Sequence, residues 1–279
     1  MKITAWNTEG RLSRFTEAGE RGSPEQILRF ITQLDSDIVF LSEAFDNAKQ
    51  IEPAINRQLD RSGYECLSVA YSGKDNRQHQ AVADPHMILL SRLEVVKYEE
   101  IRPGDIRSMI MADIVDSDTK QRVRFFCIHL DDTNEQNRLR QIDDLVPLIN
   151  NSPMPIIVMG DFNAMHAVSL PAYFFRNRLT RAAVSFVPHA NIRNVLQRLS
   201  EMAIGGTLQQ LLKGTNLVEI DQKNRPTTTP KMRGQEWLPS IRLAQIDHIF
   251  VSPEITTSNF QIAGDGGSDH RAISAYVSL

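Results

Sequence analysis

An α/β fold is predicted by this sequence of 279 residues, and two observations carry the prediction. Short apolar runs rich in β-branched residues, such as residues 155–159, alternate with segments in which apolar residues recur at helical spacing. Strand–helix–strand order also occurs twice, with polar residues at matching strand ends. No linker or low-complexity tract interrupts the pattern, so we expect a single domain over residues 1–279.

The first half of the chain contains four predicted strands and two predicted helices. Ser23-Pro24-Glu25-Gln26 is typical of a helix start, with Ser as N-cap and Pro at the first helical position. Pro53 falls inside the second predicted helix and complicates it. The predicted strands are 3–7, 37–43, 64–70 and 86–91, and the helices start at Pro24 and cover 48–61.

The second half returns to strands after a helical region. Asp116-Ser117-Asp118 is a turn signal between two strands, which predicts a hairpin. The predicted strands are 108–115, 122–130, 155–159, 244–251, 255–263 and 272–279, with an extended segment at 226–230. The predicted helices are 134–150, 172–175, 192–202 and 208–212.

A weak internal repeat links the two halves. One strand–helix–strand unit places Asn7 and Glu43 at its strand ends, and a second unit places His129 and Asp161 there. Two such units facing each other would bring all four side chains to one rim. Strand–helix–strand units recur in any α/β protein, however, so the similarity could also be unrelated to function.

A helical insertion with local basic charge is expected near residues 166–216. The segment has six Arg and Lys residues against Glu201 alone, a charge of +5 in a chain whose net charge is −3. It is either a solvated helical insertion or a cap that attracts phosphate groups. The net charge and the sequence pI of 6.2 give the whole chain no general attraction to nucleic acid.

The N-terminal sequence, the apolar runs and the two cysteines predict a cytoplasmic protein. The N-terminus enters a strand at once, without the apolar stretch of a signal peptide, and no apolar run is long enough to span a membrane. Cys66 and Cys127 lie in strand-like stretches and read as buried free thiols. A secreted chain whose leader had been removed would look the same. Nothing in the sequence indicates an oligomeric state.

Polar residues stand at or beside the ends of many predicted buried strands. Gly160-Asp161-Phe162-Asn163 follows the apolar run 155–159, and Gly permits a tight turn there. Alone this motif is weak, because Asp and Asn are common in turns. Together, the set is rich in oxygen ligands and has no Cys–His cluster, which favours Mg²⁺ or Mn²⁺ over structural zinc. Its members are Asn7, Glu9, Glu43, His129, Asp161, Asn163, Asp247, Asp269 and His270.

These residues lie in motifs that resemble those of the endonuclease/exonuclease/phosphatase superfamily, which includes DNase I, apurinic endonucleases, neutral sphingomyelinases and inositol polyphosphate phosphatases. The resemblance implies a four-layer α/β sandwich of two packed mixed β-sheets flanked by helices, with the helical insertion near 166–216. The matching motifs are Trp6-Asn7-Thr8-Glu9-Gly10, Leu41-Ser42-Glu43, Ile128-His129-Leu130, Gly160-Asp161-Phe162-Asn163, Ile246-Asp247-His248 and Ser268-Asp269-His270.

The same resemblance implies a set of metal ligands. Glu43 would be the main ligand of Mg²⁺ or Mn²⁺, assisted by Asn7 and by Glu9. Family members often have Asp where this chain has Glu9. Asp269 would be a metal ligand or a carboxylate next to the ligands.

Catalytic roles are implied for five further residues. Asp161 would orient and deprotonate the attacking water, and Asn163 would hold a phosphate oxygen. His270 would contact the scissile phosphate and would be held by Asp247 in a carboxylate–imidazole pair. His129 would sit near the leaving group, as acid or as phosphate contact. In-line displacement at phosphorus requires these functions: an activated nucleophile, neutralised equatorial oxygens and a stabilised leaving oxygen.

The expected function is metal-dependent hydrolysis of a phosphodiester by attack of water, with nucleic acid as one substrate class. A phosphatase acting on a small phosphorylated metabolite or a lipid headgroup is the alternative. The missing global positive charge weakens the case for a tight duplex binder, while the basic insertion supports it. An inactive binding protein on the same fold is the rival from another class, although such a protein is expected to lose ligands.

Several residues near the motifs are expected to have structural rather than functional roles. His166 is expected to be a surface or packing residue, and His248 should point away from Asp247 into the core. Arg107 is expected to be solvated. Tyr173, Phe174 and Phe175 are expected in a helix core rather than stacked on a base or inserted in lipid.

Overall fold

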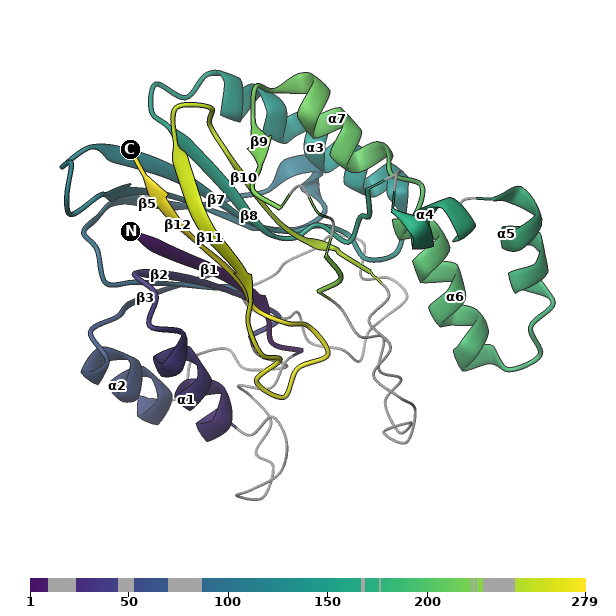
Figure 1. Ribbon diagram of the computed structural model, residues 1–279, viewed down its shortest axis with the longest axis horizontal. Helices are drawn as coiled ribbons and strands as arrows, with labels where there is room; N and C mark the ends of the chain where they lie inside the picture. Colours follow the sequence, from purple (N-terminus) through teal and green to yellow (C-terminus); the bar gives the residue numbers. More distant parts are fainter. Residues whose placement is uncertain are drawn as a thin grey trace.

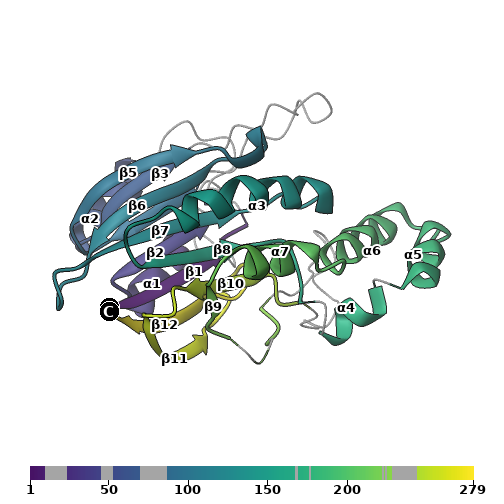
Figure 2. The same cartoon turned by 90° about the horizontal axis from the view of Figure 1, so that it is seen from above.

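The computed structural model describes residues 1–9, 24–44, 53–69 and 87–279, apart from residues 167, 168, 176, 222, 224 and 228–243. Two six-stranded sheets pack face to face, and helices cover their outer faces (Figures 1 and 2). Both sheets are mixed, because each contains one parallel strand pair among antiparallel ones. The predicted four-layer α/β sandwich is confirmed.

The first sheet has the strand order β11-β12-β1-β2-β4-β3. Its strands are β1 (Lys2–Asn7), β2 (Ile38–Ser42), β3 (Glu65–Val69), β4 (Met87–Ser91), β11 (Thr256–Ile262) and β12 (Ile273–Ser278). Helices α1 (Pro24–Leu34) and α2 (Pro53–Arg61) pack on its outer face (Figure 1). Each helix begins at a proline, which suits the first turn because a proline lacks the N–H that would be unpaired there. The predicted Ser23 cap and the predicted start of α2 at residue 48 lie outside the described residues.

The second sheet has the strand order β5-β6-β7-β8-β10-β9. Its strands are β5 (Val95–Ile101), β6 (Met109–Val115), β7 (Arg122–His129), β8 (Ile156–Asp161), β9 (Val218–Glu219) and β10 (Asp247–Val251). A short 3₁₀ turn, η1 (Pro103–Asp105), follows β5. Helices α3 (Glu135–Asn150) and α7 (Gly206–Gly214) cover the outer face, and Asn134 caps α3 by accepting from the Asn137 N–H. The sequence did not predict β5, since this edge strand is partly exposed and lacks an alternating apolar pattern.

The insertion after β8 is helical, as predicted, and it projects beyond one end of the sandwich (Figures 1 and 2). Its projecting part contains α4 (Leu170–Phe175), α5 (Arg178–Ser185), which the sequence did not predict, and α6 (Ala190–Met202), whereas α7, near its C-terminal end, packs on the second sheet. The expectation of a helix core was wrong for Tyr173 and Phe174, whose exposed fractions are 69% and 60%, whereas Phe175 does pack against the apolar cluster of the insertion. Only one face of the short α4 packs against α6, and the two exposed rings lie on the other face. No helix in the described part of the chain is long and apolar enough to cross a bilayer.

An apolar core between the two sheets fixes their relative position. It combines residues of β1, β2 and β4 with residues of β6, β7, β8 and β10. The largest contributors are fully buried aromatic and aliphatic side chains, which include Phe40 from the first sheet and Phe125 from the second. Burial of apolar area of this kind is the main force that holds packed sheets together.

Gly160, next to the last residue of β8, is expected to tolerate no side chain. A methyl group there would lie 2.0 Å from the Ile128 carbonyl oxygen and 2.8 Å from the Phe40 ring, and the φ of Gly160 is +141°. We expect Gly160→Ala to lower the free energy of unfolding by about 2–4 kcal/mol, measured by urea denaturation, because backbone strain adds to the steric overlap. Gly63→Ala is the matched control, since Gly63 also has a positive φ but no atom within 4 Å of the added methyl group. Equal losses in the two variants would contradict the steric explanation.

Candidate active site

The ends of four strands bring the predicted site residues together. Asn7 ends β1 and His129 ends β7, where His129 is in register with Asp161 at the end of β8. Asp247, the first residue of β10, pairs with Asp161 from the other side. The amide of Asn7, from the first sheet, donates to Asp161 Oδ2 in the second sheet at 2.9 Å. The two strand–helix–strand units therefore face each other, as the repeat predicted.

Backbone conformation at this rim is unusual at three residues. Glu9, Glu43 and Asn163 all have positive φ, at 54°, 48° and 49°. Asn7 Oδ1 accepts from the Glu9 N–H at 3.0 Å, and Asp161 Oδ1 accepts from the Asn163 N–H at 2.9 Å, so the same turn ends β1 and β8. Asn adopts this conformation readily, whereas Glu rarely does, and such strain is concentrated at functional sites.

Negative charge from one fully buried and two partly buried carboxylates accumulates where a metal ion was predicted. Asn7 Nδ2 donates to Glu43 Oε1 at 3.1 Å as well as to Asp161. Burial raises the pKa of Glu43 to about 7, and the neighbouring Asp269 and Asp161 carboxylates add to the effect. Burial, followed by the charge of Asp247, raises the pKa of Asp161 to about 6. Crowded carboxylates of this kind fit a hard divalent cation, which would hold them ionised.

The four predicted metal ligands are not equally placed. Glu43 and Asn7 are joined by their hydrogen bond, and Asp269 Oδ1 lies 4.0 Å from His270 Nε2 at the same site. Glu9 joins Asn7 through its backbone N–H. Glu43 lies with His129 and Asp161 in a group of side chains whose ligand atoms are close enough to share a metal ion, and the ligand roles of Glu43, Asn7, Glu9 and Asp269 stay predictions.

His270 and Asp247 form the predicted carboxylate–imidazole pair. His270 Nδ1 lies 3.0 Å from Asp247 Oδ2, and the Thr227 hydroxyl donates to the same oxygen at 2.7 Å. Burial would lower the pKa of His270, but Asp247 and then Asp161 outweigh it and raise that pKa well above its usual value. His270 Nε2 lies 3.9 Å from Asp161 Oδ2. A protonated imidazole beside the candidate base suits contact with a phosphate oxygen.

His129 lies at the centre of the site, but in a setting that the sequence did not predict. Its Nε2 is 3.5 Å from Glu43 Oε1 and 3.8 Å from Asp161 Oδ2. Arg107 Nη1 contacts the same Nε2 at 3.1 Å, and burial together with the Arg107 charge holds the pKa of His129 well below its usual value. His129 is therefore neutral, with Nε2 as an acceptor. To serve as a proton donor through Nε2, it would have to lose this contact with Arg107.

Arg107 is the site residue that the sequence assigned wrongly. Its exposed fraction is 9%, not that of a solvated arginine. Besides His129 it donates to the Leu130 carbonyl at 2.6 Å and pairs with Asp132, and Asp132 lies 3.7 Å from Arg198 of α6. A buried arginine is costly unless its donors are paired, and these partners hold it in place. The chain of contacts links the basic insertion to His129.

Asn163 is buried next to Asp161. Its Nδ2 donates to the Leu130 carbonyl at 3.0 Å, so the amide is tied to the end of β7. The predicted contact between Asn163 and a phosphate oxygen stays a prediction.

Stability without divalent metal is expected to fall as the pH rises from 5 to 8. Glu43 and Asp161 have folded-state pKa values of about 7 and 6, above their ordinary values of 4.5 and 3.8. The folded protein therefore binds these two protons more tightly than the unfolded chain does. The stability that proton binding contributes is lost as the pH rises through 6 to 7. Mg²⁺ should raise the Tm more at pH 8 than at pH 5, and Glu43→Gln should reduce that difference. An equal Mg²⁺ effect at both pH values, in thermal unfolding of the chelator-treated chain, would contradict this.

Comparison with known proteins agrees with the geometry. A model described as the endonuclease/exonuclease/phosphatase family matches residues 4–270. No curated protein sequence matches the chain significantly.

Solved structures share the fold at low sequence identity. The 3′ phosphatase NExo from Neisseria, bound to a product DNA hairpin, has 19% identity, a TM-score of 0.64 and coverage of 100% of both chains. The human Nocturnin catalytic domain with bound sulfate has 16% identity, a TM-score of 0.61 and coverage of 100% of this chain and 94% of that one. A mannosyl-6-phosphatase from Bacteroides thetaiotaomicron has 15% identity, a TM-score of 0.59 and coverage of 100% of both chains. With a family model that spans nearly its whole length, this chain belongs to the endonuclease/exonuclease/phosphatase family.

Proposed function

We propose that the chain is a Mg²⁺- or Mn²⁺-dependent phosphoesterase that cleaves phosphodiesters by in-line attack of water. One observation carries the proposal: Asp161 shares the amide of Asn7 with Glu43 and lies 3.9 Å from His270. A candidate base, a candidate metal ligand and a cationic donor thus surround one point. Members of this family are hydrolases that act on phosphoesters.

Each side chain has a distinct task in this proposal. Asp161, with a pKa of about 6, is ionised at neutral pH and can still accept a proton from water. His270, held protonated by Asp247, neutralises charge on a phosphate oxygen. A cation bound by Glu43, Asn7 and Asp269, with Glu9 as a further candidate, would supply charge neutralisation on the phosphate.

Nucleic acid is the substrate class that the surroundings of the site favour. The basic insertion reaches the site through Arg198, Asp132 and Arg107. Tyr173 and Phe174 expose their rings on α4 of the same insertion, and exposed aromatic rings are the surfaces on which unpaired bases stack. The structural relative from Neisseria was solved with a DNA hairpin, which supports this choice.

A phosphatase acting on a small phosphate ester is the second candidate. The net charge of −3 argues against a protein that grips long nucleic acid through many phosphates. The same fold occurs in a protein from Bacteroides thetaiotaomicron that is named a mannosyl-6-phosphatase, which supports this candidate.

A substrate panel with Mg²⁺ and with Mn²⁺ separates these candidates. It compares bis-p-nitrophenyl phosphate, p-nitrophenyl phosphate and a labelled single-stranded oligonucleotide. Diester cleavage that exceeds monoester cleavage supports the proposal, and the reverse order supports the phosphatase. No turnover of any substrate, together with no Mg²⁺ binding by calorimetry, would instead indicate an inactive binding protein.

Arg198→Ala is expected to weaken action on the oligonucleotide but not on the small diester. Removing one phosphate-contacting charge should raise KM for the oligonucleotide several-fold and reduce the slope of log KM against log salt by about one. Arg122→Ala is the control, because Arg122 is exposed at the start of β7, the end away from His129. If both variants change KM equally, or if neither responds to salt, the insertion does not contact the substrate.

A further inference from the structure

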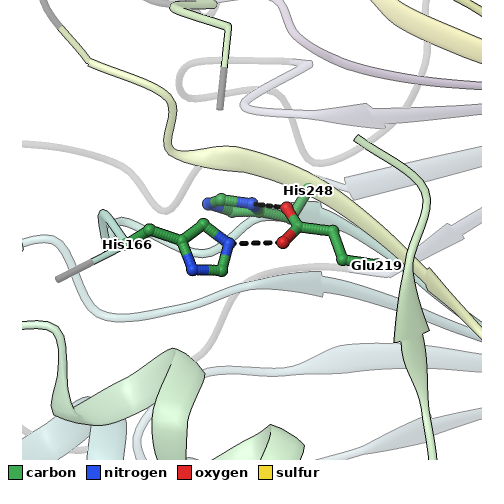
Figure 3. Close-up of side chains that lie close together, drawn as sticks. All are labelled: His166, Glu219 and His248. Atoms are coloured by element: carbon green, nitrogen blue, oxygen red, sulfur yellow. Dashed lines mark hydrogen bonds and ion pairs between the residues drawn. The ribbon is translucent and has the colours of Figure 1, made fainter. Parts of the chain in front are cut away.

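Two histidines and a glutamate meet behind the candidate active site. His166 follows β8, Glu219 ends β9 and His248 lies on β10 (Figure 3). His248 Nδ1 lies 2.7 Å from Glu219 Oε1, and His166 Nε2 contacts Glu219 Oε2. One ligand atom from each residue lies within 4.8 Å of the other two. The exposed fractions of the side chains are 17% for His166, 10% for Glu219 and 0% for His248.

The second nitrogen of His248 shows how the ring is held. Nε2 lies 3.0 Å from the Ala164 carbonyl oxygen, which can only accept, so Nε2 carries a proton. Nδ1 then faces the Glu219 carboxylate at 2.7 Å, a hydrogen-bond distance, so a proton lies between the two atoms here. A metal ion that displaced this proton would take Nδ1 and the carboxylate oxygen as two of its ligands. Imidazoles that bind metals are commonly held by this kind of N–H contact to a backbone carbonyl.

The make-up of the cluster is also suited to a cation. Glu219 has a side-chain exposed fraction of only 10%, and each of its two carboxylate oxygens faces an imidazole nitrogen, His248 Nδ1 or His166 Nε2. Two imidazoles and one carboxylate provide three ligands and leave one position for water, and His₂Glu is an established zinc-ligand combination.

We infer that His166, Glu219 and His248 bind a transition-metal ion of the Zn²⁺ class, at a site separate from the candidate active site. The inference does not depend on the proposed function. His248 follows Asp247 on β10, and adjacent residues of a strand point to opposite faces. The two sites therefore lie on opposite faces of the same strand pair, since His248 is in register with Gly160 and Asp247 with Asp161.

The position of the three ligands gives the site a structural role. His166 begins the basic insertion of residues 166–216, and Glu219 lies just after its end. β9 is only two residues long and pairs with β10 through just two residue pairs. A metal ion here ties both ends of the insertion to the strand that holds Asp247. It would thereby fix the orientation of α4–α6 relative to the candidate active site.

Zinc titration of the full chain tests the inference. The chain is stripped with a chelator, returned to 10 mM Mg²⁺ to occupy the candidate active site, and titrated with Zn²⁺ against a chromophoric competitor. We expect one Zn²⁺ per chain, and at least about 100-fold weaker binding in His166→Ala and in Glu219→Gln. His189→Ala is the matched control, because His189 is exposed at the start of α6 and should leave the affinity unchanged.

Each outcome decides the question. Absence of stoichiometric Zn²⁺ binding, or equal binding by wild type and both ligand variants, would show that the cluster is held by hydrogen bonds alone. His166 is the most exposed of the three ligands, so we expect His166→Ala to disturb folding least. If the variants do not fold, Co²⁺ added to the wild-type chain in excess Mg²⁺ decides instead. The strong visible absorption of four-coordinate Co²⁺ supports the site, and the weak absorption of six-coordinate Co²⁺ overturns it. These readouts need no hydrolysis, so failure of the proposed function leaves them valid.

Discussion

Asp161→Asn is expected to lower kcat for the best substrate of the panel by ~10²–10⁴ without abolishing Mg²⁺ binding. The amide cannot take a proton from water, while its shape matches that of the carboxylate. Asp161 accepts from Asn7 through one oxygen and from the Asn163 N–H through the other, whereas an amide at this position can accept through only one atom. The measurement is single-turnover kinetics with saturating metal, compared with wild type.

Two controls separate chemistry from folding in this experiment. The Mg²⁺ affinity of the variant should stay close to that of wild type, since Glu43 and Asp269 are unchanged, and its far-UV circular dichroism should also match, although the loss of one accepted hydrogen bond lowers the Tm. The rise of kcat with pH that ionisation of Asp161 produces in wild type should also disappear. A variant that keeps more than a tenth of the wild-type rate would rule out Asp161 as the base.

Glu43→Gln should weaken Mg²⁺ binding by at least about tenfold and lower the rate at fixed Mg²⁺ in proportion. The neutral amide removes the charge that attracts the cation, although its oxygen can still accept from Asn7. Calorimetric titration measures the affinity, and added Mg²⁺ should restore part of the rate. This partial rescue is the feature that distinguishes a metal ligand from a general base.

Glu99→Gln provides the matched control for this second variant. Glu99 is a half-exposed carboxylate on the edge strand β5 and pairs with Lys97, far from the candidate site. Its removal changes the net charge by the same amount as removal of Glu43 but should leave Mg²⁺ affinity unchanged. If the two variants bind Mg²⁺ equally well, Glu43 is not the main ligand.

The sequence predicted most of the sandwich and of the site because both depend on local patterns. Asn7, Glu43, His129 and Asp161 each follow a short apolar run, and strands that pair in parallel bring such positions to one edge. The sequence did not reveal β5, whose half-exposed residues lack a clear period, or α5, which is short and polar. Where an element is stabilised mainly by its neighbours, its own residues give a weak signal.

Contacts between distant segments account for what the sequence could not show. Arg107 reaches His129 across 22 positions with a long side chain, and no local motif surrounds it. The three residues of the zinc-class cluster come from three segments, of which His166 and Glu219 are 53 positions apart. The prediction that His248 points away from Asp247 was confirmed. Alternation along one strand, however, cannot show that Glu219 contacts His248 on the other face.

The division of the candidate active site between two sheets makes its geometry sensitive to the core far from the reacting atoms. Asn7 and Glu43 lie at strand ends of the first sheet. The second sheet holds Asp161, His129 and Asp247. The relative position of the two sheets is set largely by the apolar contacts between them, and such contacts do not depend on direction as hydrogen bonds do. If one sheet slid about 1 Å over the other, every strand pair would stay intact, yet a misplacement of that size can lower the rate about 10²-fold. The catalytic rate should therefore depend on how well the two sheets stay packed. On heating, it should fall at a lower temperature than the one at which the strands unfold.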